Sequence, residues 1–567
     1  MTRSKKGSGS KKGSEPFFEH RVSATQEPAK KGSDPFFDRR RFLGAGGFAA
    51  AGLLFGAPAA LGQDIRGRAL TREVATTAGR IRGVVLDGDI QAFYGVPYGA
   101  PTGGTNRFLP PRKPEPWTGI RETINVGFRS PQPLPGPISE IHALHRGNPM
   151  GEDCLHVNVS TPALDNALRP VMVWFHGGGF WSGSGDWLLY DGARLASSED
   201  VVVVTVTHRL NAFGFLHLPE IGGSRYASAS NVGMRDMVLA LDWVRENIES
   251  FGGDPDRVTI FGQSGGGSKV SVLTAMPAAQ GRYHRGIVMS GSLLEAENAG
   301  AATEAAERFV AATGARDVDA LQRMPWEELN AHAERNAFRM GPVVDGASLP
   351  AHPYSPGAPA LSAAVPLIIG STEYEANFFP TTPLDPIDAA TLERMVASDT
   401  GASREEVLRL IDVFRAGRPN ADHVDLYQII LSEIRFGARA HTQAERKAAQ
   451  GTAPVYKYYF TWQSPVREGK LKSYHCLDIP FAFDNVDVAA SMTGAGQDRY
   501  ALADQISSAF AAFARSGDPN HERLARWPAF DARECATMIF DNDPRVVSDP
   551  HGEERRALAE LMTQVVR

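Results

Sequence analysis

Short runs of consecutive apolar residues alternate with longer amphipathic segments from about residue 70 onward. Apolar runs of this length, rich in β-branched residues, are typical of strands that are buried on both faces. The runs are VMVWF (171–175), VVVVTVT (201–207), VTIFG (258–262), GIVMSG (286–291) and VPLIIG (365–370). Amphipathic patterns between them, such as residues 234–251, predict helices. The alternation predicts an α/β fold with a large, mostly parallel central sheet flanked by helices on both sides.

Two further segments, 296–340 and 385–450, are rich in Ala, Glu and Arg at helical spacing. They predict a helical insertion packed over the carboxyl ends of the strands, where the loops of an α/β fold build its site. No linker separates an independent second domain, so we expect residues 63–567 to form one domain.

The first 62 residues have a different character. Residues 1–38 are rich in Lys, Gly, Ser and Pro, and the segment KKGSEPFFEHR (11–21) returns as KKGSDPFFDRR (30–40). This composition predicts a disordered basic region. Three arginines at 39–41 precede an uncharged run of Gly, Ala and Leu at 42–62, a pattern that resembles a bacterial twin-arginine export signal. Cleavage is expected after Ala59 or after Gly62.

The uncharged run also has nearly the length of a transmembrane anchor, which is the alternative to a cleaved signal. Its seven Gly and Pro residues and few large aliphatic side chains favour export to the periplasm or the medium. No other segment is long and apolar enough to span a bilayer, so we expect no membrane contact beyond the signal and a soluble mature protein.

Composition narrows the class of protein further. The 567 residues are 42% hydrophobic and 22% charged, which excludes a disordered or fibrous chain. Residues 1–62 hold 11 basic and 5 acidic residues, so the rest carries 48 basic and 60 acidic ones, a balance of −12. Such an acidic body is a poor general ligand for nucleic acid. Three cysteines cannot form a disulfide scaffold, and no zinc-type spacing occurs.

The strand VTIF (258–261) runs directly into Gly262-Gln263-Ser264-Gly265-Gly266, and a helical segment follows. A G-x-S-x-G sequence between a strand and a helix indicates a nucleophile elbow, in which the serine has a strained backbone and projects above the sheet. Ser264 is therefore the candidate nucleophile.

A second glycine-rich motif, HGGG (176–179), follows the strand VMVWF directly. An oxyanion hole needs backbone N–H groups that are free of side-chain bulk and point at one spot. Gly178 and Gly179 can supply two such groups, and Gly265, after the nucleophile, a third. These three glycines are the predicted oxyanion hole.

Several longer motifs accompany these two. They are AFYGVPYGAP (92–101), EDCLHVNVSTP (152–162), WFHGGGFWSGSG (174–185), THRLNAFGFL (207–216), HCLDIPF (475–481) and SGDPN (516–520). With them, the chain resembles the type-B carboxylesterase/lipase family, the cholinesterase-like branch of the α/β-hydrolase fold, over about residues 74–550. The resemblance implies that fold, with its helical insertion over the active site, and a serine esterase that needs neither cofactor nor metal.

The resemblance also supplies the other two members of a catalytic triad. The family's acid lies five residues past a Gly that ends a strand, which is Glu375 in GSTEYEANFF (370–379), with Glu373 as the local competitor. The family's base begins the HCLDIPF segment and is His475. The order Ser264, Glu375, His475 is the nucleophile–acid–base order of the fold.

Three positions depart from the family's pattern. Ser130 stands where the partner of the EDCL cysteine is expected, so Cys154 is predicted to be a free, buried thiol. Gln263 replaces the Glu that cholinesterases place before the nucleophile, which argues against choline esters because the negative charge is lost. His208 replaces the usual Tyr before Arg209, and no consequence follows from the sequence.

Other candidate residues near these motifs have plain structural interpretations. We expect Glu152 to form an ion pair or to cap backbone N–H groups. His176, His208 and His284 are expected to be structural. Phe180-Trp181 fits either a lining of the substrate pocket or core packing equally well.

The sequence therefore predicts a serine carboxylic-ester hydrolase that works through an acyl-enzyme on a small-molecule ester. A carbamate or amide hydrolase and an acyltransferase would use the same residues, so they remain alternatives. A less favoured alternative is a non-catalytic, cholinesterase-like binding protein. Neither the substrate nor the oligomeric state follows from the sequence.

Overall fold

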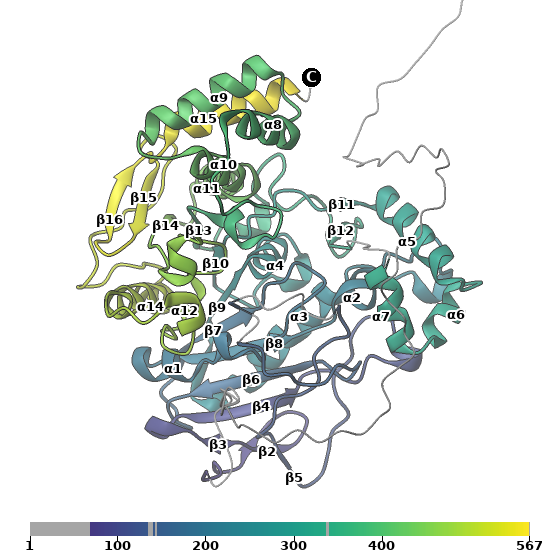
Figure 1. The fold of residues 1–567 in the computed structure, drawn as a ribbon. Coiled ribbons are helices and arrows are strands. Elements are labelled where there is room, and N and C mark those ends of the chain that lie inside the picture. Colours follow the sequence, from purple (N-terminus) through teal and green to yellow (C-terminus); the bar gives the residue numbers. More distant parts are fainter. Residues whose placement is uncertain (1–67, 134–139, 142–143, 336–339, 566–567) are drawn as a thin grey trace, which may run out of the picture. The chain divides into compact units, whose positions relative to one another are not determined.

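The computed structural model describes residues 68–133, 140–141, 144–335 and 340–565, and these belong to one compact unit (Figure 1). The predicted export signal at 1–62, with both cleavage positions, lies outside the described residues. Within the described ranges, no helix combines the length and the apolar character that crossing a bilayer requires.

The centre of the fold is a sheet that has 11 strands in the described part of the chain, in the order β16-β15-β14-β13-β10-β9-β7-β8-β6-β4-β3. The strands from β15 to β8 pair in parallel, and the flanking pairs are antiparallel. The strands are β3 (Val84–Val85), β4 (Gln91–Pro97), β6 (His156–Thr161), β7 (Arg169–Phe175), β8 (Val202–Thr207), β9 (Gly253–Gln263), β10 (Arg285–Met289), β13 (Leu367–Thr372), β14 (Val455–Phe460), β15 (Ala536–Phe540) and β16 (Arg545–Ser548). The predicted mostly parallel sheet is confirmed.

The two faces of this sheet pack into separate cores. Along β7, Val171, Val173 and Phe175 point into one core, while Met172 and Trp174 point into the other. All are buried, which explains why the strand reads as a continuous apolar run: alternate side chains face opposite sides, and both sides are covered.

Helices cover both faces (Figure 1). Residues of α3, α4 and α11 belong to the first core, and residues of α1, α12 and α14 belong to the second. The bounds of these helices are α1 (Ala193–Glu199), α3 (Val232–Asn247), α4 (Gly265–Leu273), α11 (Ala438–Ala448), α12 (Ile479–Ala482) and α14 (Asp498–Ser516).

The two segments with helical composition contain most of the remaining helices. The segment 296–340 holds α5 (Ala299–Thr313), α6 (Val318–Arg323) and α7 (Trp326–Arg335). The segment 385–450 holds α8 (Ala389–Thr400), α9 (Arg404–Gly417), α10 (His423–Ser432), a π-helical turn (Glu433–Gly437) and α11. The other elements are α2 (Asn211–Phe215), α13 (Ala490–Thr493), α15 (Gly552–Val565) and the short strands β1 (Val74–Ala75), β2 (Arg80–Arg82), β5 (Ile120–Glu122), β11 (Glu297–Asn298) and β12 (Val343–Val344).

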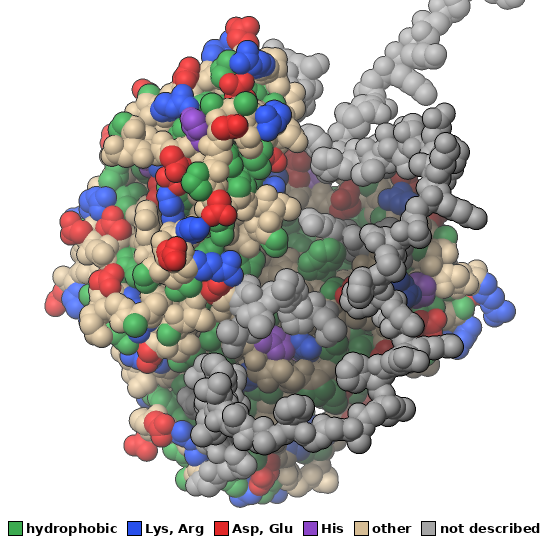
Figure 2. Space-filling view, in the orientation of Figure 1, with side chains coloured by type: hydrophobic (Ala, Val, Ile, Leu, Met, Phe, Trp, Pro, Cys, Tyr) green, Lys and Arg blue, Asp and Glu red, His purple; other side chains and the backbone are tan. Residues whose placement is uncertain are grey.

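Charged side chains of both signs are interspersed on the visible face of the molecule (Figure 2). Ion pairs on the helix surfaces include Arg409–Glu405 on α9 and Arg404–Glu393 between α9 and α8. Exposed pairs of this kind contribute little to stability, about 0–1 kcal/mol each.

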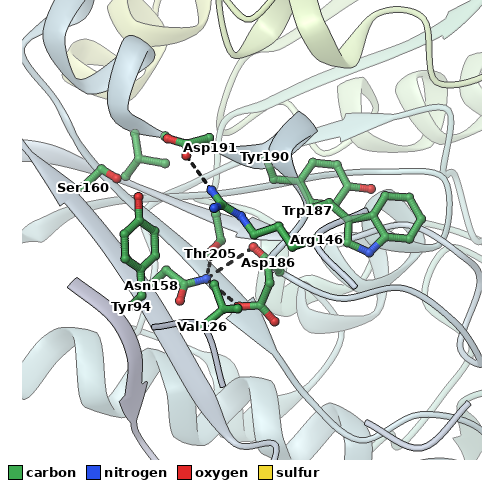
Figure 3. Close-up of a pocket in the computed structure, with 13 residues that line it drawn as sticks. Tyr94, Val126, Arg146, Asn158, Ser160, Asp186, Trp187, Tyr190, Asp191 and Thr205 are labelled. Carbon is green, nitrogen blue, oxygen red and sulfur yellow. Dashed lines mark hydrogen bonds and ion pairs between the residues drawn. The ribbon is translucent and has the colours of Figure 1, made fainter. Parts of the chain in front are cut away.

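A buried carboxylate, Asp186, connects strand β6 to the segment that follows β7 (Figure 3). It accepts hydrogen bonds from Asn158 Nδ2 at 3.0 Å and Ser184 Oγ at 2.6 Å, and His156 Nε2 lies 3.2 Å away. Burial alone would raise the pKa of Asp186, but His156 and these hydrogen bonds lower it to about 2. The ionised carboxylate therefore stabilises the fold.

Asp186→Asn should lower the free energy of unfolding at pH 7 by about 2–3 kcal/mol, the linkage equivalent of the lowered pKa. Because the folded-state pKa lies below the unfolded one, this stability is present above about pH 4 and is lost as the pH falls towards 2. Urea unfolding at pH 7 and pH 3 measures it. Asp385→Asn is the control, because Asp385 is exposed and pairs only at the surface with Lys470; an equal loss in both variants would contradict the prediction.

Candidate active site

Ser264 lies at the junction between β9 and α4, where the chain turns sharply. Its backbone has φ 58° and ψ −125°, a strained conformation for a residue with a side chain. The strained turn expected of a nucleophile elbow is therefore present at this serine.

Close backbone contacts explain the glycines on both sides of the serine. A Cβ at Gly262 would lie 2.5 Å from the carbonyl carbon of Gly266, and one at Gly266 would lie 2.0 Å from the Phe175 carbonyl oxygen. No side chain fits at these distances, so the turn requires glycine at both positions.

The side chains of Glu375 and His475 meet although 100 residues separate them. Glu375 Oε2 lies 2.5 Å from His475 Nδ1, and Glu375 Oε1 accepts a hydrogen bond from the Thr372 N–H at 2.8 Å. Both side chains are buried. The carboxylate therefore has one oxygen fixed by the end of β13 and the other directed at the imidazole.

Burial disfavours a charged His475 imidazolium, but Cys476 and Glu375 beside it favour the charged form, and the pKa of His475 is raised overall. Burial also raises the pKa of the Cys476 thiol. Of these two neighbours, Glu375 is the one with a carboxylate oxygen within hydrogen-bond distance of the ring.

Three phenylalanine rings surround the same imidazole. The ring centroids of Phe378, Phe379 and Phe436 lie 5.7, 5.6 and 4.7 Å from that of His475. Phe436 belongs to the π-helical turn, so the segment 385–450 reaches the site through this residue. These rings shield the His475–Glu375 pair from water.

Glu373, the competing acid, is engaged elsewhere. Its Oε1 lies 2.5 Å from Arg418 Nη1, and the same guanidinium also pairs with Glu554. The structure therefore brings Glu375, rather than Glu373, to His475.

The amides of Gly178, Gly179 and Gly265 lie close together. A Cβ at Gly265 would lie 2.5 Å from the Gly179 nitrogen, so the glycine loop rests directly on the first turn of α4. Among the described residues, none of the three N–H groups donates a hydrogen bond to another backbone group or a side chain. They are free to bind an anionic oxygen.

A cavity of about 480 Å³ joins these elements. Its lining includes Ser264, His475 and the glycine loop 177–179. The Ser264 hydroxyl has no hydrogen-bond partner within the described ranges. Hydrogen bonds of reactive side chains often tighten only when a substrate binds. The remaining lining residues are Ile141, Phe180, Trp181, Ser182, Trp187, Tyr190, Gln263, Met340, Phe378, Phe379 and Cys476.

Phe180 and Trp181 both line this cavity, and the Phe180 ring also packs on Phe215 at 5.1 Å between centroids. The sequence did not predict two further aromatic lining residues, Trp187 and Tyr190, whose ring centroids stack at 5.8 Å. These two rings also line a second, smaller pocket, which contains Asp186 (Figure 3). No local pattern singles out these residues.

Gln263 and Cys476 form a polar contact beside the base. Cys476 Sγ donates to Gln263 Oε1 at 3.2 Å, and Gln263 Nε2 lies 3.3 Å from His475 Nδ1. Sequence reasoning singled out Gln263 for its lost charge but missed Cys476, whose only signal was its place directly after the base.

The remaining expectations concern structural residues. Cys154 is free and buried, and Glu152 forms a partly buried ion pair with Arg107 at 2.6 Å; both predictions are confirmed. His176 and His208 stack face to face at 4.7 Å, and His284 Nδ1 accepts from the Val258 N–H. The described part of the chain contains no cluster of His, Cys, Asp or Glu suited to a metal ion.

The sheet order, the strained serine between β9 and α4, and the cavity above it define an α/β-hydrolase. The model of the carboxylesterase family matches residues 70–558. The chain is 35% identical to the para-nitrobenzyl esterase of Bacillus subtilis (strain 168) over 510 residues, which are 86% of this chain and 99% of that protein. It is 32% identical to the phenmedipham hydrolase of Pseudarthrobacter oxydans, over 84% of this chain and 96% of that protein.

Among solved structures, the carboxylesterase EST55 of Geobacillus stearothermophilus is similar with a TM-score of 0.75 and 36% identity, over 86% of this chain and 100% of that one. The chain belongs to the carboxylesterase family, and it is a carboxylic-ester hydrolase. The family predicted from the motifs is confirmed.

Proposed function

We propose that this enzyme hydrolyses carboxylic esters through an acyl-enzyme on Ser264. The Ser264 oxygen attacks the ester carbonyl carbon while His475 takes its proton, and the C–O bond to the alcohol breaks as His475 returns that proton to the leaving oxygen. Water, deprotonated by His475, then releases the acid. Glu375 holds the imidazole in the required tautomer, and the amides of Gly178, Gly179 and Gly265 bind the oxyanion.

The contact between Glu375 Oε2 and His475 Nδ1 is the observation that carries this proposal. A buried carboxylate on one nitrogen of an imidazole leaves the other nitrogen to act as a base. His475 lines the same cavity as Ser264 and the glycine loop, so base, nucleophile and oxyanion donors can act on one carbonyl group.

The lining of the cavity favours uncharged esters that carry an aromatic or other apolar group. Six aromatic side chains line it, and no Asp, Glu, Lys or Arg does so among the described residues. A volume of about 480 Å³ is within the usual range for small-molecule sites. Gln263, at the position of the cholinesterase carboxylate, gives a substrate cation no countercharge.

A fluorophosphonate probe and a p-nitrophenyl ester test the mechanism. The probe should label one residue per molecule, and mass spectrometry should place the label on the peptide that contains Ser264. The ester should release a burst of p-nitrophenol equal to the concentration of active sites wherever deacylation is the slower step. Ester hydrolysis without labelling of Ser264 would contradict the proposal.

The same site chemistry extends to related reactions. Comparing the hydrolysis rates of an ester, a carbamate and an anilide of matched shape separates an esterase from a carbamate or amide hydrolase. Repeating the assay with an added alcohol as acyl acceptor detects an acyltransferase. We expect the ester to be turned over fastest and the added alcohol to change the yield of acid little. A non-catalytic binding protein would turn over none of the three.

We further propose that the enzyme is exported by the twin-arginine pathway. The paired arginines and the uncharged run that follows them support this. N-terminal sequencing of the exported protein should give a start at Ala60 or Gln63, and replacement of Arg39–Arg41 by lysine should retain the protein in the cytoplasm.

A further inference from the structure

Lys269 is a fully buried lysine on α4, five residues after Ser264. Its Nζ donates a hydrogen bond to the carbonyl oxygen of His176 at 2.7 Å. A buried amino group is costly unless it is hydrogen-bonded, so this contact compensates for the burial of the side chain. His176 is the residue directly before the glycine loop 177–179.

The same side of α4 carries the other contacts to that loop. Lys269 follows Gly265 by four residues and Gly266 by three, which places it on the helix face that these glycines share. A Cβ at Gly266 would lie 3.1 Å from the His176 carbonyl oxygen, and one at Gly265 would lie 2.3 Å from that of Gly179. The first turn of α4 therefore packs against the glycine loop through backbone atoms. The next turn contacts the residue before that loop through the Lys269 side chain.

Aromatic and imidazole rings also lie near Lys269. Its Nζ lies 5.9 Å from the centroid of Phe180, which follows the glycine loop. Burial and the nearby Lys269 both lower the pKa of His176 and of His208, so this stacked pair is uncharged. The lysine thus contacts both ends of the loop, the carbonyl before it and the ring after it.

We propose that Lys269 is a positioning residue of the oxyanion hole, which rests on the proposed function of that hole. Through the His176 carbonyl it fixes the peptide plane from which the loop starts, and with it the direction of the Gly178 and Gly179 N–H groups. Oxyanion donors stabilise the transition state only if they are already aimed at the developing charge. Lys269 therefore acts on the reaction through the loop, without touching the substrate.

Lys269→Met tests this inference, because methionine fills similar space and has no donor. We expect kcat for a p-nitrophenyl ester to fall by about 10–100-fold with KM changed less than about threefold, since a donor displaced by about 1 Å costs up to 10²-fold. A trifluoromethyl ketone, which forms a tetrahedral oxyanion adduct with the nucleophile, should bind more weakly by the same factor as kcat/KM falls.

Lys447→Met is the matched control. Lys447 is equally buried and also donates to backbone carbonyls, but these belong to Ser362 at 2.6 Å and Ala363 at 3.1 Å, far in sequence from the glycine loop that Lys269 contacts. Both variants should melt at a lower temperature than the parent enzyme. Only Lys269→Met should lose kcat and affinity for the ketone; an equal loss in Lys447→Met would show that general destabilisation, rather than loop position, is responsible.

If Lys269→Met does not fold, Lys269→Gln takes its place. The glutamine side chain keeps an N–H donor but is one bond shorter than lysine. In Lys269→Gln, kcat and the affinity for the ketone should both fall by the same factor, of a few fold. Unchanged kcat and ketone affinity in either folded variant would overturn the role of Lys269. Ser264→Ala in the same assay keeps the two proposals separate, because activity retained in that variant would overturn the proposed function instead.

Discussion

Ser264→Ala should lower kcat by about 10⁵-fold or more while the protein stays folded, because the acyl-enzyme needs the serine oxygen as its nucleophile. Alanine at φ 58° bears a backbone strain similar to that of serine, so we expect little change in stability. Activity is measured by the steady-state rate with a p-nitrophenyl ester, and acyl-enzyme formation by the burst of p-nitrophenol. Circular dichroism shows whether the variant is folded.

Ser268→Ala is the matched control for this experiment. Ser268 lies in the first turn of α4, four residues after Ser264, but it does not line the cavity, so its variant should retain the activity of the parent enzyme. A Ser264→Ala enzyme that still gives a burst, or a Ser268→Ala enzyme that loses it, would place the nucleophile elsewhere.

Glu375→Gln should lower kcat by about 10³–10⁴-fold, the scale on which the acid of a triad contributes. The Thr372 N–H would retain the amide oxygen of the new side chain, so its NH₂ group would face His475 Nδ1. Nδ1 would then have to accept a hydrogen bond from this NH₂ group, so the ring proton would lie on Nε2. No ring nitrogen would then be left to act as a base for Ser264.

The pH profile gives a second measure of the same variant. Glu375 helps to raise the pKa of His475, so its loss should lower that pKa and move the acid limb of the kcat/KM profile to lower pH. Glu373→Gln is the control and should keep both rate and profile, with some loss of stability because Arg418 loses a partner. The reverse outcome, with Glu373→Gln inactive, would exchange the two assignments.

The parts of the fold that local patterns encode could be predicted from the sequence. The apolar runs 171–175 and 201–207 are β7 and β8, because strands buried on both faces leave a continuous apolar signature. The elbow at Ser264 was also predictable, since its glycines are required by contacts within the strand–turn–helix unit itself.

The family resemblance assigned Glu375 as the acid, but local sequence could not exclude Glu373, since both residues closely follow β13. Arg418, which binds Glu373, comes from the end of α9, and such a long-range contact leaves no trace in local spacing. The stacking of His208 on His176 is equally non-local, because these residues follow different strands.

The state of the three cysteines bears on how the protein can be made. All three are free and buried, so no covalent cross-link restricts the unfolded chain. The stability of the fold comes from packing and hydrogen bonding instead, and a thiol reductant has no bond to break. The described fold therefore forms without any disulfide bond having to be made.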